Sequence, residues 1–286
     1  EHSSTATTIH YIGNVLQRQG KYREALQEYK KALEIREKTL GKENASTADT
    51  YHCTGMVFRQ QGRHGDALQQ YEKALPIFLN AYGTNHPSTA EIYHCMGSVF
   101  DDQGRYDEAM KQYQKALEIK LKVYGREHSS TASSYHCLGK VFRYQGQHED
   151  ALQQYQQALE ISLKALGSEH PSTASIHHSI GNLLHDQGKY EAAMLHYKKV
   201  LEIQLKVYRP GHPSTAATYQ CIANILFNRG NYKEAMLYYQ NALEINLQAL
   251  GPEHISTASA CHCIGNVLQA QSNYEDAMRQ YQKALE

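Results

Sequence analysis

Histidine and cysteine are the residues of this chain whose types could support metal chemistry. The sequence contains 17 histidines, and four of them precede a cysteine directly: His52-Cys53, His94-Cys95, His136-Cys137 and His262-Cys263. Adjacent residues of a helix point about 100° apart, so one such pair chelates a metal poorly. Pairs from neighbouring repeats should lie too far apart for metal bonds of about 2.0–2.3 Å. We therefore expect no metal site and no cofactor.

The spacing of the cysteines also argues against disulfides. Cys53, Cys95 and Cys137 follow one another at intervals of 42 residues. Equivalent residues of stacked helical repeats lie about 10 Å apart, whereas a disulfide needs Cα atoms within about 7 Å. We expect free thiols in a reducing compartment, which favours a cytoplasmic protein.

Composition narrows the function classes further. The chain has 29 basic and 29 acidic residues, so it lacks the basic surface that a nucleic-acid binder or an anionic-membrane binder requires. No apolar run approaches the length of a membrane span. A catalytic site needs residues that break the repeat and converge, and no His, Cys, Ser or acidic residue is unique in that way. No glycine-rich phosphate loop is present. We expect a protein that is not an enzyme.

An internal repeat of 42 residues organises the whole sequence. The triplet Ser-Thr-Ala recurs without insertion, and it begins at Ser4, Ser46, Ser88, Ser130, Ser172, Ser214 and Ser256. A Gly column contains Gly13, Gly55, Gly97, Gly139, Gly181, Ala223 and Gly265, and a Tyr column contains Tyr29, Tyr71, Tyr113, Tyr155, Tyr197, Tyr239 and Tyr281. Strict periods of this size are typical of solenoids. The expected repeats are about 2–43, 44–85, 86–127, 128–169, 170–211, 212–253 and an incomplete 254–286, within a single domain over 1–286.

Each repeat is expected to form two helices. In repeat one the first helix should run from Ser-Thr-Ala to the turn at Gln19-Gly20, and the second should begin near Tyr22 and end before Gly41. Two residues compete as N-cap of the first helix: the Ser that opens the triplet, or the His or Asn two positions before it. Small residues such as Gly13 and Ala32 should lie where the two helices cross.

One residue breaks the helical pattern. Pro76 stands in a second helix at a position where other repeats carry Glu. Proline cannot donate the helical hydrogen bond and its ring crowds the preceding turn. We expect a kink or a break there.

The pattern resembles the tetratricopeptide repeat, whose signature is represented in repeat one by Gly13, Gly20, Ala25, Tyr29 and Ala32. The segment from Gly83 to Ala90 reads Gly-x-x-His-Pro-Ser-Thr-Ala, which is similar to the 42-residue repeats of kinesin light chain and related arrays. The resemblance implies an all-α, right-handed superhelical solenoid of about seven antiparallel helix-turn-helix repeats. It also implies that the first helices line a concave groove that takes a peptide.

Three columns of the first helices are candidates for that groove, because residues four and three apart share a helix face. The His column contains His10, His52, His94, His136, His178, Gln220 and His262. The Asn column contains Asn14, Met56, Ser98, Lys140, Asn182, Asn224 and Asn266. The outer column contains Gln17, Arg59, Asp101, Arg143, His185, Phe227 and Gln269. The alternative for the His column is a structural stripe between neighbouring first helices.

The most consistent interpretation is a scaffold or adaptor that binds a peptide segment of a protein partner, with no nucleic acid and no membrane involved. The alternative is a structural spacer that self-associates end to end. Because imidazole titrates near neutral pH, the His column also predicts weaker stability or altered binding between about pH 7.5 and 5.5.

Overall fold

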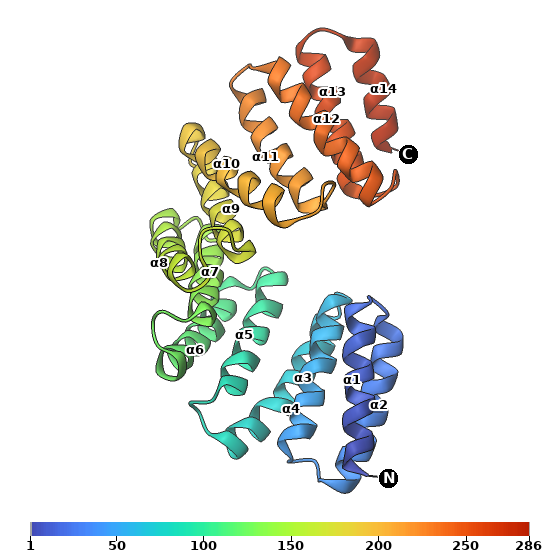
Figure 1. The fold of residues 1–286 in the computed structure, drawn as a ribbon, viewed down its shortest axis with the longest axis vertical. Helices are drawn as coiled ribbons and strands as arrows, with labels where there is room; N and C mark the ends of the chain where they lie inside the picture. Colours follow the sequence, from blue (N-terminus) through green and yellow to red (C-terminus); the bar gives the residue numbers. More distant parts are fainter. Residues whose placement is uncertain (1, 286) are drawn as a thin grey trace. The chain divides into compact units, whose positions relative to one another are not determined.

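The computed structural model describes residues 2–285, which form fourteen α-helices and no strand (Figure 1). The helices are α1 (Ser3–Arg18), α2 (Tyr22–Thr39), α3 (Ala45–Gln60), α4 (His64–Tyr82), α5 (Pro87–Asp102), α6 (Tyr106–Tyr124), α7 (Ser129–Tyr144), α8 (His148–Leu166), α9 (Pro171–Asp186), α10 (Tyr190–Val207), α11 (Pro213–Asn228), α12 (Tyr232–Ala249), α13 (Ile255–Ala270) and α14 (Tyr274–Leu285). Odd-numbered helices are the first helices of the repeats, and even-numbered helices are the second. The expected all-α architecture of helix-turn-helix repeats is confirmed.

The chain divides into two compact units, Glu1–Asp150 and Ala151–Glu286. In the first unit, α1 packs against α2, α3 against α4 and α5 against α6, and each second helix also contacts the next first helix. The second unit repeats this arrangement in α9 with α10, α11 with α12 and α13 with α14. Each unit is therefore a stack of helical hairpins, as a solenoid requires.

The residue two positions before the Ser-Thr-Ala triplet is the N-cap of the first helix. The Asn44 side chain accepts a hydrogen bond from the Ser46 amide at 2.9 Å. Five histidines do the same through the imidazole Nδ1, at 3.1–3.2 Å: His86, His128, His170, His212 and His254. The structure thus decides between the two candidates in favour of the His or Asn position. An imidazole can accept this bond only while Nδ1 is unprotonated.

The Tyr and Gly columns fix the spacing of the two helices of a hairpin. A Cβ atom added to Gly13 would lie 2.5 Å from Cε1 of Tyr29, and one added to Gly55 would lie 2.5 Å from Cε1 of Tyr71. Both tyrosines are fully buried, and so is Ala32 on the same second helix as Tyr29. The glycine is small because the aromatic ring rests on its backbone, which confirms the expected close crossing.

Pro76 does not interrupt its helix. Helix α4 runs without a break from His64 to Tyr82, so the expected break is wrong. The proline is exposed, which leaves its ring outside the packed interface, and the hairpin holds α4 on its other face. The missing N–H still costs one helical hydrogen bond.

We predict that Pro76→Glu stabilises the protein. Glutamate occupies this position in other second helices, where Glu118 is exposed. Restoring the amide donor and removing the ring should raise the free energy of unfolding by about 1–3 kcal/mol, measured by urea denaturation. Pro76→Ala should give most of this gain, because the effect comes from the backbone. If neither variant is more stable than the parent, packing of the neighbouring helices fully offsets the destabilising effect of the proline.

Candidate functional site

The Asn column is tied to the core by the tyrosine hydroxyls. The Tyr29 hydroxyl donates to Oδ1 of Asn14 at 2.7 Å, and Tyr197 donates to Oδ1 of Asn182 at 2.7 Å. The same bond joins Tyr239 to Asn224 and Tyr281 to Asn266. The Tyr29 and Tyr281 hydroxyls also face Oε1 of Gln17 at 3.0 Å and of Gln269 at 2.7 Å, so each shares its hydrogen between two acceptors. Since Oδ1 is occupied, the side-chain amide is held in one orientation. Its NH2 group is the part left to donate to another molecule.

The asparagines differ in how far they reach solvent. Asn14, Asn182 and Asn266 are half-buried, and Asn224 is exposed. Asn182 also lies beside the His column, with Nδ2 3.2 Å from Nδ1 of His178. Where the column departs from Asn, the tyrosine partner changes: Ser98 accepts from Tyr113 at 3.1 Å, whereas Met56 leaves the Tyr71 hydroxyl without an oxygen acceptor. The sequence alone did not reveal this link between column and core.

The His column lies between neighbouring first helices. Each imidazole packs beside the tyrosine of its own repeat, with ring centroids 5.5 Å apart for His10 and Tyr29 and 5.6 Å for His178 and Tyr197. Its Nε2 also faces a cysteine of the next repeat. The Nε2–Sγ distances are 3.9 Å from His10 to Cys53, 3.4 Å from His52 to Cys95 and 3.7 Å from His178 to Cys221.

The exposure of the His column follows this packing. His10 is buried, and His52, His94, His136 and His178 are half-buried. His262, over which no further described helix packs, is exposed. Gln220 replaces histidine in repeat six, and its Nε2 is buried without a hydrogen-bond partner among residues 2–285. These contacts agree with a structural stripe, and they leave the Asn and outer columns as the more accessible part of the first-helix surface.

Burial holds several imidazoles in the neutral form. Desolvation lowers the pKa of His10 to about 4, with smaller contributions from the charges of Arg36 and His52. It also lowers the pKa of His177 to about 4, aided by His196 and Lys199. Desolvation likewise lowers the pKa of His52 and His94. Loss of water is therefore the largest cause of these shifts, ahead of the charges of neighbouring groups.

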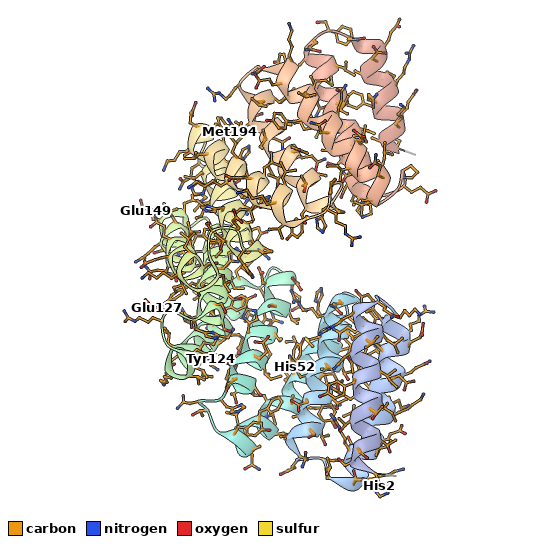
Figure 2. The ribbon with its side chains drawn as sticks, viewed as in Figure 1. His2, His52, Tyr124, Glu127, Glu149 and Met194 are labelled. Atoms are coloured by element: carbon orange, nitrogen blue, oxygen red, sulfur yellow. The ribbon has the colours of Figure 1, made fainter. Side chains whose placement is uncertain are left out.

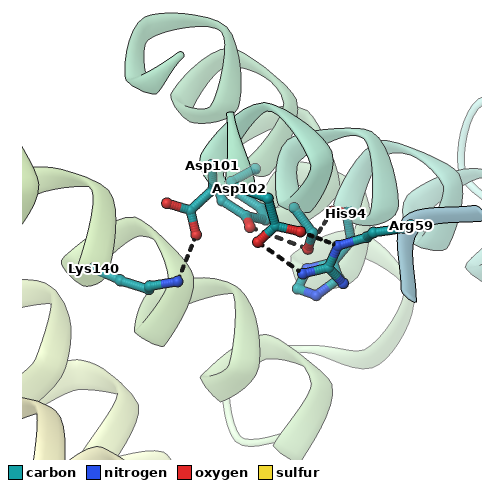
Figure 3. A network of polar contacts seen from close by, with 7 residues as sticks. Arg59, His94, Asp101, Asp102 and Lys140 are labelled. Atoms are coloured by element: carbon teal, nitrogen blue, oxygen red, sulfur yellow. Dashed lines mark hydrogen bonds and ion pairs between the residues drawn. The ribbon is translucent and has the colours of Figure 1, made fainter. Parts of the chain in front are cut away.

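The outer column carries ion pairs that join neighbouring repeats (Figure 3). The Arg59 guanidinium donates from Nε to Oδ2 of Asp102 at 2.6 Å, and Lys140 Nζ donates to Oδ2 of Asp101 at 2.8 Å. Arg143 lies half-buried beside the ring of Tyr144. The Arg59–Asp102 pair is partly exposed and should contribute little to stability, whereas the Asp101 side chain that pairs with Lys140 is buried. Their effect is to place fixed positive and negative charges along the first-helix surface.

A second polar column, inside the stack, escaped the sequence analysis. It contains Arg36, Lys120, Ser162, Gln204 and Asn246, all buried and spaced by multiples of 42 residues. Arg36, Gln204 and Asn246 each donate to the backbone carbonyl of the triplet serine in the next repeat. The 42-residue spacing of these residues is visible in the sequence. Polar residues at otherwise apolar positions do not by themselves predict buried hydrogen bonds between repeats.

The argument that metal ligands of neighbouring repeats lie too far apart is wrong at one place. His52 lies between α3 and α5 (Figure 2), and its Nε2 is 3.4 Å from Sγ of Cys95. The contact joins residues 43 apart, so histidine meets the cysteine that follows the equivalent histidine one repeat later. All six cysteines are free thiols, as expected.

The lowered histidine pKa values predict that acid destabilises the fold. The unfolded chain takes up protons near pH 6.5, whereas His10 and His177 do so only near pH 4. Between these values the unfolded state binds more protons, so the free energy of unfolding falls as the pH falls, by up to about 1.4 kcal/mol per pH unit for each group. The urea midpoint should therefore drop between pH 6.5 and 5, and less steeply in His177→Gln. A midpoint constant over this range would contradict the assignment.

Several solved structures share the fold of this chain. No curated protein gives a significant sequence match. Among solved structures, BtubC (BKLC) from P. vanneervenii aligns with a TM-score of 0.65 at 19% identity, covering 84% of this chain and 93% of that one. A kinesin-light-chain-type protein of Podosopora anserina with nearly identical TPR-like repeats aligns with a TM-score of 0.60 at 26% identity, covering 70% and 94%. The apo form of RapI aligns with a TM-score of 0.70 at 17% identity, covering 98% and 96%.

No described helix is long and apolar enough to cross a membrane. The family model described as Tetratricopeptide repeat matches residues 4–80, 53–122, 88–164, 130–206 and 214–286. Together with the helical hairpins and the Tyr–Gly packing, these matches show that the chain belongs to the tetratricopeptide repeat family, as an array of the kinesin-light-chain-like type.

Proposed function

We propose that this protein is an interaction scaffold that binds an extended peptide segment of a partner protein along its first-helix surface. The observation that carries the proposal is the repeated hydrogen bond from a buried tyrosine to the asparagine of the same repeat. It fixes the side-chain amides of the Asn column and leaves their NH2 groups as donors. A row of preorganised donors matches the carbonyls of a peptide backbone and loses little entropy on binding.

The family supports this function in general terms. Tetratricopeptide repeat arrays are scaffolds typical of protein–protein interaction and are typically not catalytic. Six free thiols suit a reducing compartment, and we propose a cytoplasmic location on that ground.

The direct test removes the NH2 donors of the asparagines and keeps the Oδ1 atoms that accept from the tyrosines. Asn→Ala would leave buried tyrosine hydroxyls unpaired and lower stability, so it would confuse the two effects. Asn182→Asp, Asn224→Asp and Asn266→Asp retain Oδ1 for the tyrosine and remove the NH2 donor. Peptides selected from a random displayed library on the parent protein should bind the triple variant at least about tenfold more weakly, because each hydrogen bond contributes about 0.5–1.5 kcal/mol.

A matched control separates the lost donors from the added charge. Gln153→Glu, Gln240→Glu and Gln282→Glu add the same charge at exposed positions of the second helices. This variant should bind the selected peptides as the parent does. Equal affinity of the Asn→Asp variant and the parent, measured by fluorescence anisotropy, would rule out the Asn column as the binding surface.

End-to-end self-association is a second candidate function. Light scattering distinguishes the functions, because only end-to-end stacking raises the mass with concentration.

A further inference from the structure

Three potential metal ligands converge between repeats two and three. His52 on α3 and Glu91 and Cys95 on α5 each offer one ligand atom, and these atoms lie within 4.8 Å of one another. Nε2 of His52 is 3.4 Å from Sγ of Cys95, and Sγ is 3.9 Å from Oε1 of Glu91. Glu91 and Cys95 are four residues apart, so they share one face of their helix.

The spacing suits tetrahedral coordination. With bonds of about 2.3 Å to sulfur and 2.0–2.2 Å to nitrogen or oxygen, two ligands of a tetrahedral zinc ion lie about 3.5 Å apart. The His52–Cys95 and Cys95–Glu91 distances are already close to this value. Imidazole, thiolate and carboxylate are all zinc ligands, and the two anionic groups would balance the charge of a divalent ion.

The carboxylate is what distinguishes this place from the other repeats. The equivalents of Cys95 in repeats two to seven are Cys53, Cys95, Cys137, Ser179, Cys221 and Cys263. The residues four positions before them are Asp49, Glu91, Ser133, Ser175, Ala217 and Ser259. Asp49 is one methylene shorter, and the charge of the buried Arg36 acts on it. In residues 2–285, His52, Glu91 and Cys95 form the one group of His, Cys and acidic residues with ligand-like spacing.

A neighbouring lysine would orient the carboxylate. Buried Lys120 places Nζ 4.0 Å from Oε2 of Glu91, while Oε1 faces Cys95. The two carboxylate oxygens are thus divided between an ammonium group and the thiol. This ion pair can fix the direction of the Glu91 carboxylate, although the positive charge of Lys120 opposes binding of a second cation nearby.

We propose that His52, Glu91 and Cys95 bind a zinc ion that clamps α3 to α5, with water as the fourth ligand. Zinc binding requires the Cys95 thiol to lose its proton, while His52 binds through its neutral form. An ordinary cysteine thiol is protonated at neutral pH, so zinc binding there should release about one proton.

The test titrates Zn²⁺ alone into the reduced, chelator-treated chain by calorimetry, in buffers of different ionisation enthalpy. We expect one high-affinity ion and about one released proton per chain. Cobalt substitution should give visible bands of tetrahedral Co²⁺ and a near-ultraviolet thiolate charge-transfer band. Zinc should also raise the melting temperature, because it binds only the folded site.

Variants at the site give the decisive comparison. Removing a group that only orients a metal ligand costs about 10 to 100-fold in affinity, so loss of a ligand itself in Cys95→Ser or Glu91→Gln should cost at least about 100-fold. The control Cys221→Ser removes an equivalent thiol beside His178, where Ala217 takes the place of the carboxylate, and should leave binding unchanged. Glu91 is half-exposed, so Glu91→Gln decides the matter if Cys95→Ser fails to fold. Absence of high-affinity zinc in the parent, or full affinity in Glu91→Gln, would overturn the proposal.

Discussion

The contact on which the structure depends is a tyrosine ring lying on the backbone of a glycine. In the hairpin formed by α1 and α2, Tyr29 rests on Gly13 so closely that no Cβ fits without displacing the ring. This contact brings the two helices together and directs the hydroxyl through the hairpin to the first-helix surface, where it meets Asn14. A single residue type therefore sets the spacing of the core and the orientation of the surface amide.

This coupling explains why the Asn column cannot be interpreted as surface alone. An asparagine that receives a buried hydroxyl contributes to stability and to recognition at once, and exchanging it for alanine affects both. Positions at which one repeat differs from the others show where a repeat has its own chemistry. Met56 leaves Tyr71 without an oxygen acceptor, and Glu91 supplies a carboxylate that the other repeats lack at this distance from a His–Cys contact. At such positions a single repeat has a polar contact or a potential ligand that the other repeats lack.

The periodicity of the sequence was sufficient to predict the helices, their glycine ends and the small residues at the hairpin crossing. Gly83 has a φ of 82°, as expected of a left-handed terminus. The stacking geometry was not predictable from the period. His52 contacts Cys95, which is 43 residues away and not 42. Neighbouring first helices are therefore displaced along each other, so that a residue faces the position after its equivalent in the next repeat. Pro76 was misjudged because its exposure, which makes the proline tolerable, depends on how α4 packs.

The most direct test of the tyrosine contact compares two Tyr→Phe substitutions by urea denaturation. Tyr197→Phe removes a hydroxyl that donates to Asn182 at 2.7 Å, and Tyr71→Phe removes one that has no oxygen acceptor. Both changes keep the ring on its glycine. Tyr197→Phe should lower the free energy of unfolding by about 0.5–1.5 kcal/mol, while Tyr71→Phe should lower it less, because the Tyr71 hydroxyl has only the weak sulfur partner Cys95. Equal losses at the two positions would contradict the claim that the tyrosine hydroxyl links the core to the Asn column.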